Sequence, residues 1–377
     1  MRPFFLLAIP PLVFLLFWIA HRPRFDQASA HCISVSDFNL SSSLPRLDFT
    51  AQGASHRDYY ASEAAHDLCA AHGYDVFKPG AAPRSGERKV YDLFMVNTEL
   101  DFLEIRLRTL YDYVDYFIIV ESTRSFQGGE KELLIRNAWD RFSDFHDKMI
   151  YHQLQFPEDF KSKLKTAWDY ENFQRDAMLL QVFPSLSGRK APVEGDAIIV
   201  ADVDEIPRPA TLLVLRTCEF PRYLTLASRF YYYSFQFLHK GAEWQHPQAT
   251  YFEGMEKTIR PTNLRNGDEG IFLLRELEKG ILGNAAWHCS SCFATIGQFL
   301  NKMTSFSHIW MNDKSYQDRD RIADAVRSGS DLWGRWRDQF DRVDNNMDVP
   351  TFLLENKERF RYMLNRDGET AGFSDYP

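Results

Sequence analysis

Four consecutive residues, Asp202, Val203, Asp204 and Glu205, carry the clearest chemical signal in this 377-residue sequence. They follow an apolar run at 197–201 (AIIVA), which is typical of a buried β-strand. Side chains two residues apart in an extended segment face the same way, so the carboxylates of Asp202 and Asp204 are expected to converge. Hard divalent cations bind carboxylate oxygens and commonly keep a substrate phosphate as a further ligand. The pattern therefore predicts a metal site that neutralises the charge developing on a diphosphate leaving group.

The elements around this acidic segment decide how it is interpreted, because Asp-x-Asp patterns also occur at solvated loop starts. Strand character is found in four apolar runs, namely 90–96, 116–120, 149–154 and 197–201. Two segments between them are expected to be helical: apolar residues recur every three or four positions over 100–114, and 166–183 continues until Pro184. Alternating strands and helices predict an α/β fold with a mostly parallel central sheet. In such sheets ligands bind beyond the carboxyl ends of the strands.

Polar residues follow the other predicted strands as well. Asn97 and Glu99 come after the first strand and are expected to contact a nucleotide. Glu121 and Ser122 come after the second, where contact with the nucleotide and a role as a helix cap or turn both stay open. Arg229, which follows a further strand-like run, is expected either to bind phosphate as a bidentate donor or to form a surface salt bridge.

The composition indicates a folded, acidic protein. Hydrophobic residues make up 45% and aromatic residues 15% of the chain, which is enough for a sizeable core and excludes global disorder. The formal net charge of -8 leaves no basic footprint, so no nucleic-acid partner is expected.

The N-terminus carries an apolar run without a formal charge at residues 4–20. Its 17 residues reach the lower limit for spanning a bilayer, and residues 1–24 are expected to be an uncleaved signal anchor. A cleaved secretory signal, with a small-residue site at 28–30, is the alternative, and a buried core helix is the weakest interpretation. With the anchor, the protein would be a single-pass type II protein of the Golgi membrane with a lumenal catalytic domain; with cleavage, it would be secreted.

Residues 25–87 are rich in Ser, Ala, His and Pro and are expected to form a stem or linker, with one short helix near 63–72. An N-glycosylation triplet at 39–41 is consistent with a lumenal body. The chain has five cysteines, so at least one thiol is left unpaired or pairs with another chain. Cys289 and Cys292 stand without further zinc ligands, which favours a local disulfide or two small buried residues over a zinc site.

Several blocks of the sequence resemble glycosyltransferase family 17. Residues 201–208 (ADVDEIPR) resemble its Asp-Glu-Ile-Pro signature, and 286–293 (AWHCSSCF) resemble its more specific Trp-His-Cys-Ser-x-Cys-Phe block. Four further segments match in order, namely 97–106, 120–122, 317–329 and 352–360. The resemblance covers about residues 88–365, which is identified as the catalytic domain, with 366–377 as a C-terminal tail.

The resemblance implies a GT-A type nucleotide-sugar-binding domain with UDP-N-acetylglucosamine as donor, a divalent metal ion, with manganese expected, and inversion at the anomeric carbon. It also implies a mannosyl residue of a protein-linked N-glycan as acceptor. Acceptor choice is usually set in loops, and 260–282 looks divergent. Another donor or acceptor, or an inactive lectin-like Golgi relative, therefore stays open. A metal-dependent phosphoesterase or nucleotidyltransferase would typically need more ligands than this pattern supplies.

The matched blocks also imply roles for single residues. His288 is expected to be a third metal ligand beside Asp202 and Asp204, or to contact the diphosphate, whereas a lone histidine is by default structural. His308 has the same two interpretations with less support. The aromatic run 230–237 is expected mostly in the core, with some rings left for the acceptor sugar. An inverting transfer needs a base, for which the sequence offers four carboxylates, Glu205, Glu243, Glu253 and Asp320.

Overall fold

A computed structural model describes residues 60–78, 88–158, 160 and 166–377 of the chain. The expected signal anchor at 1–24, the cleavage site, the glycosylation triplet and Cys32 all lie outside these residues. Within the part that the structure describes, no helix has both the length and the apolar character needed to span a bilayer.

The predicted strands form the parallel part of one sheet. They are β1 (Val90–Met95), β2 (Tyr116–Glu121), β3 (Met149–Gln153) and β4 (Ala197–Asp202), in the spatial order β3-β2-β1-β4. Nearly all side chains of β1, β2 and β4 are buried, as expected for strands covered on both faces. The α/β class and the parallel centre of the sheet are thus confirmed.

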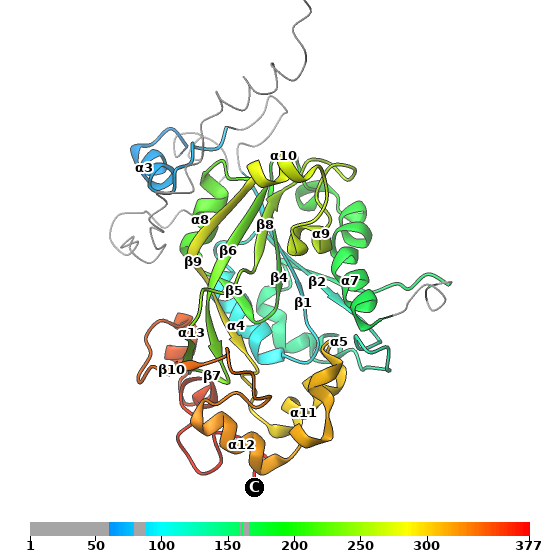
Figure 1. Ribbon diagram of the computed structural model, residues 1–377. Coiled ribbons are helices and arrows are strands. Elements are labelled where there is room, and N and C mark those ends of the chain that lie inside the picture. Colours follow the sequence, from blue (N-terminus) through cyan, green and yellow to red (C-terminus); the bar gives the residue numbers. More distant parts are fainter. Residues whose placement is uncertain (1–59, 79–87, 159, 161–165) are drawn as a thin grey trace, which may run out of the picture. The chain divides into compact units, whose positions relative to one another are not determined.

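Helices cover both faces of these strands (Figure 1). One face packs against α4 (Leu100–Leu110) and α8 (Pro209–Thr217). The other packs against α9 (Pro261–Asn266) and a π-helical turn, Met178–Val182, that continues α7 (Ala167–Ala177). Both predicted helices are therefore present, as α4 and α7. In each of them the regular α-helix ends before the predicted segments 100–114 and 166–183 do.

Beyond β4 the sheet becomes mixed. Strand β8 (Gln248–Tyr251) runs antiparallel to both β4 and β6 (Tyr223–Tyr232). Strand β9 (Lys279–Ser290) is parallel to β6 and antiparallel to the short β5 (Glu205–Pro207). At the far edge, β7 (Ser234–His239) and β10 (Phe340–Arg342) add antiparallel pairs. The other α-helices among the described residues are α3 (Glu63–Ala71), α5 (Leu134–Asn137), α10 (Phe272–Leu277), α11 (Ile296–Ser305), α12 (Arg319–Ser328), α13 (Thr351–Glu355) and α14 (Arg361–Leu364). The 3-10 turns in this part of the chain are Trp139–Phe145, Phe183–Ser185, Gly188–Lys190, Ile309–Asn312 and Lys314–Tyr316.

Part of the expected stem packs with the body. Helix α3 is close to the predicted position of a short helix, and Cys69 at its end forms a disulfide with Cys218, which follows α8. Val76 adds a β-bridge to Cys218. Residues 60–78 therefore belong to the folded body, although composition alone places them in a linker.

The C-terminal residues are also part of the core. The guanidinium of Arg366 is fully buried and donates to the backbone oxygens of Tyr233, Phe293 and Ala371. Asp375 accepts hydrogen bonds from the first backbone N–H groups of α11, at 2.7 and 3.0 Å. The segment 366–377, expected to be a tail, thus fixes the start of α11.

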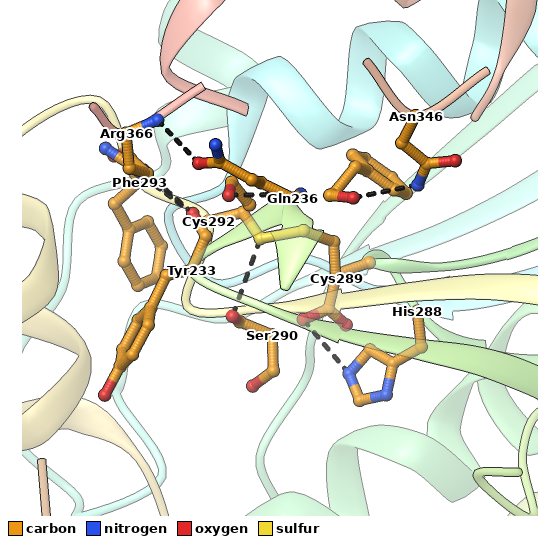
Figure 2. Close-up of a disulfide and its surroundings, with 12 residues drawn as sticks. Tyr233, Gln236, His288, Cys289, Ser290, Cys292, Phe293, Asn346 and Arg366 are labelled. Carbon is orange, nitrogen blue, oxygen red and sulfur yellow. Dashed lines mark hydrogen bonds and ion pairs between the residues drawn. A yellow bond between two sulfur atoms is a disulfide. The ribbon is translucent and has the colours of Figure 1, made fainter. Parts of the chain in front are cut away.

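A second disulfide joins Cys289 and Cys292, which confirms the local pairing expected for this pair (Figure 2). It closes the turn after β9 beside Arg366 and Phe293. Of the two interpretations left open by the sequence, the disulfide is the one that the structure shows.

Candidate active site

The acidic segment forms a tight turn between β4 and β5, and a buried ion pair holds this turn. Arg106 of α4 pairs with Asp92 of β1 at 2.6 Å, and neither side chain is exposed. The Nη1 atom of Arg106 also donates to the backbone oxygens of Glu205 at 2.7 Å and Asp202 at 3.2 Å. Arg106 thereby satisfies carbonyl groups of the turn, so its hydrogen bonds fix the backbone that carries the three carboxylates.

Asp202, at the end of β4, is already paired with two arginines. Its Oδ2 lies 2.8 Å from Nη2 of Arg265, and its Oδ1 lies 3.2 Å from Nη2 of Arg175. Burial raises the pKa of the Asp202 carboxyl group; the charge of Arg265 opposes this, and the negative charge of Glu205 adds to it. The first carboxylate of the motif is therefore balanced by protein cations.

Glu205 is buried and makes a full set of hydrogen bonds. Both of its carboxylate oxygens lie 2.8 Å from guanidinium nitrogens of Arg265. The backbone N–H of Asp202 and the indole N–H of Trp244 donate to the same carboxylate at 2.9 and 2.8 Å. Burial opposes ionisation of Glu205, but the charge and hydrogen bonds of Arg265 hold its pKa well below its usual range. The ionised form of this carboxylate is therefore favoured, and its two oxygens accept four hydrogen bonds.

Asp204 is the carboxylate of the motif that has no arginine partner among the described residues. Its Oδ2 lies 3.6 Å from Nε2 of His288, because β5 pairs with β9 and brings His288 opposite Glu205. Burial opposes ionisation of Asp204, but the charge of His288 lowers its pKa overall. The His288 ring stacks on Phe230 at 4.9 Å, and its buried Nδ1 finds no hydrogen-bond partner within the described part of the chain.

A cavity of about 240 Å³ opens in front of Asp204 and His288. A neighbouring cavity of about 20 Å³ has room for little more than a water molecule, so the larger one is the candidate ligand site. The larger cavity is lined by Asp202, Asp204, Glu205, Phe230, Tyr232, Trp244, His288, Ser290, Ser291, Phe299, Lys302, Met303, Phe306, His308, Met311, Trp333, Arg335 and Asp338. Asn97 and Glu99 line the smaller one together with Asp202 and Asp204.

The structure thus brings together most of the predicted strand-end residues, together with both histidines. Glu99 holds the turn after β1 by accepting from the backbone N–H groups of Asn97 and Thr98 at 3.0 and 2.8 Å. The Asn97 side chain donates to Ser305 of α11 at 2.8 Å. His308 lines the larger cavity, and burial lowers the pKa of its imidazole, which favours the neutral form.

Glu121 and Ser122 line neither cavity. The buried carboxylate of Glu121 accepts from the backbone N–H of Ile135 at the start of α5 and from Tyr151, and the Ser122 hydroxyl accepts from the backbone N–H of Arg124. These contacts correspond to the cap and turn roles that the sequence left open beside nucleotide binding.

Four other predicted residues lie away from the acidic turn. Arg229 lies on the side of β6 opposite to Phe230. Its positive charge there acts to lower the pKa of Tyr231 and of Asp348. The carboxylates of the other three are engaged elsewhere: Glu253 pairs with Arg222, Asp320 accepts from Tyr376, and Glu243 accepts from the backbone N–H of Asn284.

Sequence reasoning missed several residues of the site. Trp244 and Arg265 complete the environment of Glu205, and Lys302 and Arg335 line the larger cavity. Arg335 pairs with Asp331 and Asp338, whereas Lys302 makes no ion pair with any described carboxylate. None of the four lies in a matched block. The only local signal is the sequence spacing of Lys302, which comes three residues after Phe299 and four before Phe306.

The donor set fits a cation in part. Among the described residues no three His, Cys, Asp or Glu side chains are grouped closely enough to hold a metal ion alone. Asp204 and His288 present an oxygen and a nitrogen donor to the same cavity, while Asp202 is engaged with arginines. A cation here would take Asp204 and His288 and would need oxygens from the substrate or water to complete its shell.

The sequence profile of glycosyltransferase family 17 matches residues 50–369. Two curated relatives are the β-1,4-mannosyl-glycoprotein 4-β-N-acetylglucosaminyltransferases of Rattus norvegicus and Homo sapiens, each 25% identical over 316 residues and 76% of this chain. The match covers 56% and 57% of these relatives, so this chain spans little more than half of their length. Among solved structures, a mannosyltransferase of Pyrobaculum calidifontis in complex with GDP-Man and Mn²⁺ is 12% identical, with a TM-score of 0.32 over 73% of this chain and 71% of that chain. That score is too low to carry an argument.

Proposed function

This chain belongs to glycosyltransferase family 17, and from that membership we propose that it is a metal-dependent inverting glycosyltransferase. Its donor would be UDP-N-acetylglucosamine, and its acceptor a mannosyl residue of a protein-linked N-glycan. The names of the relatives support an N-acetylglucosaminyl group and a mannosyl-glycoprotein. The observation that carries the proposal is the pair formed by Asp204 and His288, which faces a cavity at the carboxyl end of β4. Ligand binding at this end of the strands is the rule for parallel α/β sheets.

Asp204 and His288 would hold the cation, with manganese as the expected ion. A bound divalent ion would supply charge neutralisation for the diphosphate leaving group. Lys302 lies on the same cavity without a described carboxylate partner, and its ammonium group is suited to bind a phosphate oxygen. The positive charge of Lys302 acts to lower the pKa of Asp204. The positions assigned to the phosphate and to the cation are therefore close enough to interact.

Glu205 has a positioning role in this proposal. Its ionised carboxylate holds Arg265 and Trp244 in place and caps the backbone N–H of Asp202. A base must have a free lone pair directed at the acceptor hydroxyl, and the four hydrogen bonds to Glu205 leave it poorly placed for that task. Asp202 likewise orients Arg175 and Arg265 rather than acting as the main metal ligand.

We also propose a lumenal, Golgi location with residues 1–24 as the membrane anchor. The two disulfides, Cys69 to Cys218 and Cys289 to Cys292, support this part of the proposal, because disulfides form and persist mainly in oxidising compartments. An inactive lectin-like relative is the second candidate and would keep the cavity without the transfer reaction.

The deciding experiment incubates the purified protein with a panel of UDP-sugars and N-glycan acceptors, with and without Mn²⁺, and measures UDP release and glycan mass. We expect transfer from UDP-N-acetylglucosamine that depends on the metal ion and is lost in Asp204→Asn. Binding of glycan without transfer from any donor would support the lectin-like candidate instead. Release of UDP from a different sugar nucleotide would show that the protein is a glycosyltransferase with another donor.

A further inference from the structure

Trp244 is an exposed aromatic side chain that the fold holds rigidly. Solvent reaches 37% of the surface of this residue. Its backbone N–H and carbonyl pair with Ser228 of β6 at 3.0 and 2.8 Å, and its indole N–H donates to Glu205 at 2.8 Å. The backbone N–H, the backbone carbonyl and the indole N–H of Trp244 therefore all have hydrogen-bond partners within the protein.

The ring stands beside the Asp204 and His288 pair. Its centroid lies 5.3 Å from the His288 ring and 5.5 Å from Phe230, and it lines the same cavity. Among the described tryptophans that line this cavity, Trp333 is only 8% exposed and stacks on Phe299. Trp244 alone among the described tryptophans combines a place on the cavity with an exposed ring.

We propose that Trp244 is the platform on which a pyranose ring stacks next to the reaction centre. One face of a pyranose carries C–H groups, which pack on an aromatic plane, while its hydroxyl groups stay at the edge for hydrogen bonds. Because Glu205 fixes the indole and Ser228 fixes the backbone of Trp244 before any ligand binds, little conformational entropy is lost when a sugar covers the ring.

This inference deepens the proposed function and rests on it for the identity of the sugar. Two pyranoses approach the reaction centre of a glycosyltransferase, the donor sugar and the terminal acceptor sugar, and either has the C–H face that the platform requires. UDP without its sugar contains no pyranose and therefore lacks this C–H face. The contribution of Trp244 is thus expected in the binding of sugars and not in the binding of the nucleotide.

Two variants separate stacking from the hydrogen bond to Glu205. Trp244→Phe and Trp244→Leu both lose the indole N–H, but only Trp244→Phe keeps an aromatic face. Isothermal titration of the full chain in detergent with Mn²⁺ would measure Kd for UDP, UDP-N-acetylglucosamine and a mannose-terminated N-glycan core fragment. We expect one of the two sugar ligands to bind about ten-fold more weakly to Trp244→Leu than to Trp244→Phe, which corresponds to a stacking contribution of about 1.4 kcal/mol.

The three titrations identify the source of the sugar. A loss confined to UDP-N-acetylglucosamine, with UDP unchanged, places the donor sugar on Trp244; a loss confined to the glycan fragment places the acceptor there. The control is Trp336→Leu, because Trp336 is 76% exposed and does not line the cavity. This control should bind all three ligands as the wild type does.

Equal affinities of Trp244→Phe and Trp244→Leu for every ligand would overturn the platform, because the ring face would then contribute nothing. If the wild type binds and transfers the sugar under that outcome, the proposed function stands without the platform. If instead the wild type binds the glycan fragment, never transfers sugar, and still loses affinity in Trp244→Leu, the platform stands and the proposed transferase activity fails.

Discussion

The guanidinium of Arg265 meets the carboxylate of Glu205 with two contacts of 2.8 Å, one to each oxygen. The same guanidinium reaches Asp202, also at 2.8 Å. Arg265 belongs to α9, which packs on the face of the sheet opposite to α4 and α8. One side chain thus neutralises two carboxylates of the acidic turn, and Asp204 is the one that no described arginine pairs with.

Replacing Arg265 by glutamine should destabilise the fold and not only the site. Two carboxylates would lose their cation, one of them the buried Glu205, and breaking such a pair from one side costs about 3–5 kcal/mol. Arg265→Lys should recover only part of this, because an ammonium group lacks the planar fork that matches a carboxylate. Urea denaturation followed by circular dichroism measures the change. Arg260→Gln, at an exposed arginine preceding the same helix, should change stability little. An unchanged urea midpoint for Arg265→Gln would contradict the role given to the pair.

Asp204→Asn and His288→Ala should abolish the response to the metal ion and spare the fold. Neither side chain holds the acidic turn, whereas both would contribute donors to the cation. We expect the melting temperature without ligands to stay close to that of the wild type, and the added stabilisation by Mn²⁺ with UDP to disappear.

Trp287→Ala provides the contrast to His288→Ala on the neighbouring residue. Trp287 is buried, donates to Asp348 at 3.0 Å and carries Arg208 over its ring, so its truncation should cost about 3–5 kcal/mol. Similar losses of melting temperature in Trp287→Ala and His288→Ala would show that His288 is structural. A full Mn²⁺ and UDP shift in Asp204→Asn would place the cation elsewhere.

Lys302→Gln should weaken the binding of UDP without affecting the nucleoside. A charge-assisted hydrogen bond to phosphate contributes about 1.5–3 kcal/mol, so the Kd for UDP should rise by about ten-fold or more. Uridine lacks the diphosphate, and its affinity should stay the same. Lys314→Gln, at an exposed lysine outside the cavity, is the matched control. A parallel loss for uridine and UDP would mean that Lys302 shapes the pocket and does not bind phosphate.

Elements that depend on local sequence patterns were predictable, whereas contacts between distant residues were not. Strands β1, β2 and β4 and helix α4 were predictable, because β-branched and aromatic runs and a spacing of three or four residues act within one element. The pair of Arg265 with Glu205 joins residues 60 positions apart, and no spacing rule indicates it. Strand β9 (KGILGNAAWHCS) contains Gly and Asn, which obscure its strand character, yet it is the strand that brings His288 to the acidic turn.

The same distinction explains the individual site residues. Asp204 and His288 belong to blocks that resemble the family, so they were identified and the structure brings them together. Lys302 and Trp244 acquire their place only through packing of α11 and of the segment before β8 around the cavity. The disulfide of α3 was not predictable for a related reason: a polar composition does not reveal that Cys69 pairs with a cysteine 149 residues away.

A chain that begins at residue 88 should be less stable than one that begins at residue 60. The shorter chain lacks α3, loses the Cys69 to Cys218 disulfide and exposes the apolar surface that α3 covers on α8. Removing a native disulfide typically costs about 2–5 kcal/mol. Cys69→Ser in the longer chain should account for part of the loss, and chemical denaturation of all three measures it. Equal stability of the two truncated chains would show that residues 60–78 do not stabilise the folded body.

Glu104 should make the stability of the protein depend on pH in the acid range. Its carboxylate lies 2.6 Å from a nitrogen of Arg359 and 2.7 Å from one of Arg141, and thereby ties α4 to the segment before α14. Burial opposes its ionisation, but the hydrogen bonds and charges of Arg359 and Arg141 lower the pKa of Glu104 to about 2. An unfolded glutamate titrates near 4.5. The folded state therefore binds the proton more weakly, and the stabilisation by Glu104 is complete above pH 4.5.

As the pH falls from about 4.5 toward 2, this stabilisation should be lost, because protonation then favours the unfolded chain. The glutamine variant Glu104→Gln cannot ionise, so the wild type should exceed it in urea midpoint at pH 6, and the difference should shrink steadily at pH 4 and pH 3. Glu132→Gln, at an exposed glutamate, controls for the loss of one negative charge and should show no such convergence. A constant difference between wild type and Glu104→Gln across this range would mean that the carboxylate stabilises the fold by shape and hydrogen bonding alone, and that its ionisation is not linked to folding.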